Sequence, residues 1–216
     1  MEVVKKLKIH NKLITCIIQK SKKRSTLSYS LSYGQLRILV HEKVSEERMI
    51  QIIENSLPKE KVDLINNDDL VNDEYIYLLG NKRKIVVLNE NQNAASFNDI
   101  VIRNRKDIDK YIEKFALEVF TERVRRYEKV MNSPYIHEVL LKNLKGAYGK
   151  NFTVTHKIVL EKRLIHFGLD IIDQTVIHEI AHDFEANHSG RFYKILKQYC
   201  PEHKEKKERL SLGVRK

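Results

Sequence analysis

The sequence predicts an α+β fold in which a β-rich first part precedes a more helical second part. Short stretches of alternating apolar and polar residues dominate residues 3–40, as is typical of strands with one buried face. From about residue 107, apolar residues recur at intervals of three and four, the period of half-buried helices. We therefore predict a β-rich N-terminal region over residues 1–100 and a second domain over residues 101–216.

The composition is that of a folded protein. Of 216 residues, 42% are hydrophobic and 32% are charged, which fits a globular chain better than a disordered or fibrous one. The first residues are charged, and no apolar run approaches the length of a signal segment or a membrane span. We therefore expect a cytoplasmic protein that has no membrane partner. Cys16 and Cys200 are too few and too far apart to indicate a disulfide framework or a cysteine zinc site.

The charge balance is strongly basic. Forty Lys and Arg stand against 29 Asp and Glu, a formal net charge of +11. Such an excess can favour contact with nucleic acid or an anionic surface. Much of it is Lys accompanied by many Asn and Ile, as an AT-rich coding sequence produces. Charge alone therefore leaves a nucleic-acid partner open without establishing one.

Turn and cap residues divide the first part into elements. Tyr33 and Gly34 supply a turn within residues 3–40, where we expect an antiparallel meander. Ser45 begins a short amphipathic helix, which Pro58 terminates.

A hairpin and a loop follow. The hairpin strands Tyr75–Leu79 and Ile85–Leu88 are joined at Gly80 and Asn81, and the Asn-rich run Asn89–Asn98 is predicted to be a loop.

The second part begins with a long helix from about Asp107 to Val130. Its polar face carries basic residues that we interpret as solvated: Arg123, Arg125, Arg126 and Lys129. Residues 136–144 and 152–160 are predicted to form two strands.

The motif His-Glu-x-x-His occurs once, on a predicted helix that Asp170 or Asp173 would cap. His178 and His182 are four residues apart and share one helix face, so both imidazoles can point at one ion. Glu179 is rotated by about 100° from His178, as expected of a general base that meets the attacking water.

A catalytic zinc ion needs a third protein ligand and one open position. His188 is the candidate ligand, because Asn187 can end the helix in a left-handed turn and Ser189 can begin the next helix. His156 and His166 flank the strand that precedes the motif, so either could enter the cleft, although structural roles are the default for both.

At these residues the sequence resembles the YgjP-like metallopeptidase family, which is related to the SprT, Spartan and Wss1-type peptidases. The resemblance is carried by the His178–His182 motif, by Asn187-His188-Ser189 with Phe192, and by Cys200-Pro201-Glu202. It covers about Leu140 to Leu210 firmly and the remaining chain weakly. It implies a zincin-like core with an antiparallel edge strand, Zn²⁺ on His178, His182 and His188, and Glu179 as the catalytic residue.

One departure from the family pattern concerns the segment before the edge strand. Such proteins usually show Trp-Gly-Ser-Cys where this chain has Tyr148-Gly149-Lys150-Asn151. The aromatic residue and the glycine are kept, and the small polar pair is not, which bears on substrate details.

These patterns predict a zinc metallopeptidase that hydrolyses peptide bonds, with a protein or peptide as substrate. We expect the strand at Thr153–Leu160 to border the cleft, where an extended substrate can add as a further strand. Tyr148 is a candidate for stabilising the oxyanion, with packing as its alternative role. The alternative function is a basic nucleic-acid-binding protein with a structural or inactive zinc site.

Overall fold

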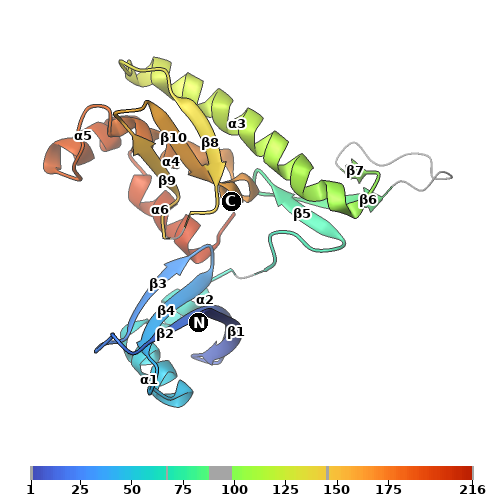
Figure 1. The fold of residues 1–216 in the computed structure, drawn as a ribbon, viewed down its shortest axis with the longest axis vertical. Coiled ribbons are helices and arrows are strands. Elements are labelled where there is room, and N and C mark those ends of the chain that lie inside the picture. Colours follow the sequence, from blue (N-terminus) through green and yellow to red (C-terminus); the bar gives the residue numbers. More distant parts are fainter. Residues whose placement is uncertain (1, 67, 88–98, 145, 216) are drawn as a thin grey trace. The chain divides into compact units, whose positions relative to one another are not determined.

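A computed structural model describes residues 2–66, 68–87, 99–144 and 146–215 (Figure 1). Contacts group the chain into two compact units. The first unit comprises Met1–Asp68 and Glu208–Val214, and the second comprises Asp69–Lys207 and Arg215–Lys216. The predicted loop Asn89–Asn98 lies outside the described residues.

The first unit is a four-stranded sheet with two helices. Its elements are β1 (Glu2–Ile9), β2 (Lys12–Ser21), β3 (Ser28–Ser32), β4 (Gln35–His41), α1 (Glu46–Ser56) and α2 (Lys59–Asp63). The strand order is β1-β2-β4-β3, with β2 and β4 parallel and the two outer pairs antiparallel. The predicted meander is therefore wrong, because β4 lies between β2 and β3. In β4, Leu36, Ile38 and Val40 are fully buried, whereas β3 is largely polar and takes the edge.

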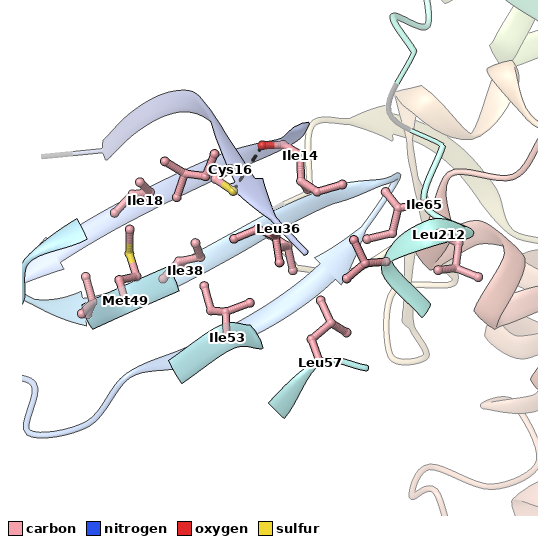
Figure 2. Packing of buried hydrophobic residues seen from close by; sticks show 14 residues of the cluster. Ile14, Cys16, Ile18, Leu36, Ile38, Met49, Ile53, Leu57, Ile65 and Leu212 are labelled. Carbon is pink, nitrogen blue, oxygen red and sulfur yellow. Dashed lines mark hydrogen bonds between the residues drawn. The ribbon is translucent and has the colours of Figure 1, made fainter. Parts of the chain in front are cut away.

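One helix covers the buried face of this sheet. Met49 and Ile53 of α1 pack against alternate residues of β2 and β4, among them Ile14, Leu36 and Ile38 (Figure 2). The helix begins as predicted, since the hydroxyl oxygen of its cap Ser45 accepts a hydrogen bond from the Arg48 amide. Pro58 then follows its last turn, as expected.

The second unit begins with a small sheet of β5 (Tyr75–Leu78), β6 (Asn81–Val87) and β7 (Ile100–Ile102). The predicted hairpin is confirmed, because β5 and β6 pair in antiparallel fashion around Leu79 and Gly80. Both turn amides donate to carbonyls of the 3-10 helix η2 (Lys162–His166), at 2.8 and 3.3 Å. These bonds connect the hairpin to the second unit, which begins at Asp69, although the hairpin precedes the boundary predicted near residue 100. A division into a 1–100 region and a 101–216 domain stays a prediction.

A long helix and a second three-stranded sheet form the larger part of this unit (Figure 1). The helix α3 (Ile108–Met131) confirms the prediction for this segment, and it follows the 3-10 helix η1 (Arg105–Asp107). The sheet has the order β8-β10-β9, with β8 (Glu138–Lys142), β9 (Gly149–Phe152) and β10 (Lys157–Glu161). Central β10 is parallel to β8 and antiparallel to β9. Helix α3 packs against β8 and against α4 (Leu169–Ala181), which also packs against β9.

Two helices complete the chain, α5 (Gly190–Tyr199) and α6 (His203–Leu212), the second of which begins in one unit and ends in the other. Across the described residues, no helix combines the length and the apolar character needed to cross a membrane.

The prediction that the basic residues of α3 are solvated is wrong at one position. Arg123 is 8% exposed, and its guanidinium donates two hydrogen bonds of 2.6 and 2.7 Å to the carboxylate of Asp173 on α4. Such a bidentate pair fixes both position and angle, so it joins α3 to the helix that carries the motif. Asp173 therefore does not cap α4, which begins two residues after Phe167, at Leu169, with Gly168 as its cap.

Candidate active site and metal centre

Two of the motif residues lie in the last turn of α4 and the third at its end. His178 and Glu179 are inside the helix, and His182 is its C-cap residue. The helix thus ends earlier than predicted, and Asn187 has no positive φ angle. The chain turns back and brings His188 to the cap of α5, where the Ser189 hydroxyl oxygen accepts hydrogen bonds from two amides, as predicted for the start of this helix.

The side chains of His178, His182 and His188 lie close together. Their ligand nitrogens all lie within 4.8 Å of one another, and the Nε2 atoms of His178 and His188 are 3.1 Å apart. Two nitrogen ligands on one tetrahedral Zn²⁺ lie about 3.4 Å apart, given bonds of about 2.0–2.1 Å. The donor set therefore fits a single ion in the form of a three-histidine site.

Neighbouring groups orient these imidazoles. The Nδ1 of His182 lies 3.1 Å from the carbonyl oxygen of Glu185, which leaves its Nε2 for the ion. The fully buried ring of Phe192 on α5 lies 4.7–5.0 Å from all three imidazole centroids. One aromatic side chain thus serves as a common support for the three candidate ligands.

The protonation states suit metal binding. Burial, followed by the neighbouring His182 and His188, lowers the pKa of His178 to about 3. Burial and His182 also lower the pKa of His188. Both imidazoles are therefore neutral near pH 7, the form that coordinates a metal.

Glu179 is almost wholly buried, at 5% exposure. Burial raises the pKa of its carboxyl group to about 8. A cation at the three imidazoles would act in the opposite direction by favouring the carboxylate. A carboxyl group whose proton affinity is balanced in this way is suited to general base chemistry.

The edge strand β9 approaches Glu179 at a glycine. A Cβ atom added to Gly149 would lie 2.6 Å from Glu179 Oε1 and 2.8 Å from its Cγ. No side chain fits in that space without displacing the carboxyl group. This contact explains why a glycine stands at the first position of β9, where the strand lies against α4.

A buried polar network fixes the end of α4. The Asn151 amide donates to the carbonyl oxygen of Glu179 at 2.8 Å and to Asp183 Oδ1 at 2.7 Å. The same carboxylate accepts a hydrogen bond from Ser133 and lies 3.1 Å from His137 Nε2. The other ring nitrogen of His137 is 3.0 Å from Glu128 Oε1. The network ties α3, β8 and β9 to the residue that follows His182.

A cleft of about 560 Å³ opens over this site. The catalytic candidates Glu179, His178, His182 and His188 all line it, together with β9 and the segment before it. Tyr148 also lines the cleft, and its role toward the substrate stays a prediction.

His156 and His166 are not among the described residues that line the cleft. His166 is buried, and its Nδ1 lies 2.6 Å from the Tyr77 carbonyl oxygen, so it anchors the β5–β6 hairpin. His156 stacks on Tyr135 at 4.0 Å between centroids. The strand beside the cleft is β9, whereas the predicted Thr153–Leu160 segment contains β10, which is central in its sheet.

Sequence reasoning missed the residues around the ligands. Asn151, Asp183 and His137 act through long-range contacts that periodicity does not reveal. A usable signal existed in Asp183, a carboxylate directly after the motif. Phe192 appeared in the sequence as part of the family resemblance, and its contact with three histidines depends on the turn between α4 and α5.

Comparison with known proteins identifies the family of this chain. A family model described as "YgjP-like, metallopeptidase domain" matches residues 25–212. No curated protein matches the chain. Two solved structures are similar to parts of it. The abylysin metallopeptidase zymogen of Pyrococcus abyssi is 21% identical with a TM-score of 0.38, over 43% of this chain and 90% of that one. The jannalysin zymogen of Methanocaldococcus jannaschii is 20% identical with a TM-score of 0.35, over 40% and 91%.

The family match spans most of both units and includes the whole His-Glu-x-x-His segment and His188. We conclude that this chain belongs to the YgjP-like family of metallopeptidases.

Proposed function

We propose that the protein is a zinc-dependent peptidase in which His178, His182 and His188 hold Zn²⁺ and Glu179 is the general base. The observation that carries the proposal is the convergence of three imidazoles within 4.8 Å beside a buried carboxyl group in one cleft. The fold we propose for this part is a zincin-like core, with the motif helix α4 beside the antiparallel edge strand β9.

The chemistry follows from the roles of these groups. Zn²⁺ held by His178, His182 and His188 would lower the pKa of a bound water to about 7 and would polarise the scissile carbonyl group. Glu179 accepts the proton of the attacking water and delivers it to the leaving amine. Gly149 keeps the carboxyl group in place, because no other residue at that position leaves room for it.

The substrate is proposed to bind along β9. This strand pairs with β10 on one side only, so its other edge offers main-chain groups to an extended peptide. Tyr148 lies at the start of this path and is proposed to contact the substrate.

The alternative function, a basic nucleic-acid-binding protein with a structural or inactive zinc site, rests on net charge alone. A buried carboxyl group in the cleft beside the three imidazoles favours catalysis, since a structural site has no use for it. Contact with nucleic acid stays a prediction, and a salt series of DNA binding would test it.

The metal site predicts the behaviour of a His188→Ala variant. The parent protein is expected to retain about one zinc per chain after mild chelator washing, and the variant is expected to retain much less, because two imidazoles bind zinc far more weakly than three. Elemental mass spectrometry measures both. His41→Ala is the control, since His41 lies in the first unit and is not among the described residues that line the cleft, and its side chain accepts a hydrogen bond from the Lys43 amide. Equal zinc in the parent and in His188→Ala would contradict the ligand assignment.

The general base predicts a different result for Glu179→Gln. This variant keeps the shape of the side chain and the three ligands, so it should bind zinc like the parent. Its kcat for peptide hydrolysis should fall by about 10²- to 10⁴-fold, the usual contribution of a general base. Turnover at the parent rate would exclude Glu179 from the mechanism.

A further inference from the structure

The lining of the cleft includes polar groups that the proposed hydrolysis does not use. Gln174 lies on α4 four residues before His178 and therefore on the same helix face. It is only 5% exposed, yet it lines the cleft. Among the described residues, no hydrogen-bond partner is recorded for its amide. Because the residue is otherwise buried but lines the cleft, its amide group is available to a ligand there.

A positive charge also lines the cleft. Lys207 on α6 is exposed and lines the cleft with Gln174. Its charge acts on both His178 and His188, which places the ammonium group close to the candidate metal site. No ion pair of Lys207 is recorded within the described part of the chain.

The rest of the cleft contains almost no compensating negative charge. Glu179 is the only carboxyl group among the described residues that line it. The second lysine of the lining, Lys150, lies between Gly149 and Asn151, which both face α4. Because side chains alternate along a strand, the Lys150 side chain leaves from the other face of β9. Of the two lysines in the lining, Lys207 is therefore the one that we consider as a partner for the substrate.

We propose that Gln174 and Lys207 form a subsite for a carboxylate carried by the substrate residue next to the scissile bond. The ammonium group neutralises the carboxylate, and the Gln174 amide donates a hydrogen bond to it. The carboxylate can belong to an Asp or Glu side chain or to the C-terminus of the substrate. The inference rests on the proposed peptidase function and adds a substrate class to it.

Binding to a protein that does not turn over tests the subsite separately from hydrolysis. The probes are acetylated and amidated fluorescent heptapeptides that carry Glu, Gln or Lys at one central position, titrated into zinc-loaded Glu179→Gln. A charged hydrogen bond changes affinity by about 10- to 100-fold, so the Glu peptide should bind at least tenfold more tightly than the Lys peptide. Adding Lys207→Glu should reverse this order, and adding Gln174→Leu should weaken the Glu peptide without a change in net charge. Equal affinities for the Glu and Lys peptides would overturn the proposal, even if hydrolysis were established.

Two further arms complete the experiment. Lys110→Glu changes the net charge as Lys207→Glu does, but Lys110 is exposed on α3 and is not among the cleft residues, so the preference for Glu should persist. Peptides without internal acids, with a free or an amidated C-terminus, distinguish the two sources of the carboxylate. Preferential binding of the free C-terminus assigns the subsite to a terminal carboxylate. If Lys110→Glu lost the preference for the Glu peptide, net charge alone would explain that preference, and the subsite would be overturned.

Peptide hydrolysis by the parent protein separates the two failures. Cleavage of all heptapeptides at similar rates would refute the subsite and leave the peptidase in place. Selective binding without any cleavage by the zinc-loaded parent would refute the peptidase and leave a carboxylate-binding cleft.

Discussion

Gly149→Ala is expected to remove most of the catalytic activity while the three histidines still bind zinc. The added Cβ would lie 2.6–2.9 Å from three atoms of the Glu179 side chain, closer than non-bonded atoms approach. Since β9 is held by β10, we expect the glutamate to move. A displaced general base costs about 10²- to 10³-fold in kcat. Steady-state hydrolysis and zinc content, measured on the same preparation, check this expectation.

Gly190→Ala is the matched control for this prediction. Gly190 is the first residue of α5, next to the ligand His188, but a Cβ added there meets nothing within 4 Å. Alanine also favours a helix more than glycine does, so the control should keep both turnover and zinc. If Gly149→Ala hydrolysed peptides as fast as Gly190→Ala, the close contact would have no part in positioning Glu179.

Asp183→Ala is expected to lower the free energy of unfolding by about 3–5 kcal/mol, the usual effect of removing one partner from a buried ion pair. The side chains of Asp183 and His137 are both fully buried. Without the carboxylate, His137, Asn151 and Ser133 each lose a hydrogen-bond partner. Urea unfolding at constant pH measures the difference.

Glu138→Ala is the control, because Glu138 forms an exposed ion pair of 2.8 Å with Lys157 on the neighbouring strand. Pairs of this kind contribute about 0–1 kcal/mol, so its effect should be several times smaller. Equal destabilisation by the two variants would contradict a special role for the buried network.

The same network predicts how stability depends on pH. Burial lowers the pKa of His137, but hydrogen bonds with Asp183 and Glu128 outweigh it and raise the pKa above its ordinary value. Burial raises the pKa of Asp183, and hydrogen bonds from His137, Ser133 and Asn151 outweigh it and lower the pKa. The contribution of His137 is therefore complete below about pH 6.5 and is lost as pH rises through its folded-state pKa. That of Asp183 is complete above about pH 4 and is lost as pH falls through its lowered pKa.

Unfolding of the parent and of His137→Gln between pH 5 and pH 9 tests this dependence. The advantage of the parent should be largest at the acidic end of this range and should shrink as pH rises. A difference that stayed constant across the range would show that folding does not raise the pKa of His137.

Local sequence signals identified most elements of the fold. Ser45 and Pro58 bound α1, Gly80 lies in the β5–β6 turn, and apolar residues at intervals of three and four located α3. Each of these signals acts over a few residues, within one element or one turn. Strand order is not local. The alternation of apolar and polar residues in β4 predicted a strand with one buried face, but it could not predict that β2 is the parallel neighbour of this strand.

By itself, the sequence determined the motif helix, the candidate ligands and the candidate general base, because the spacing of His178, Glu179 and His182 within a helix decides which side chains share a face. Only the tertiary structure decided how the end of that helix is held. Gly149, Asn151 and His137 come from other elements and reach it through contacts between residues far apart in the chain. The distances between such residues depend on how strands and helices pack, which no period in the sequence records.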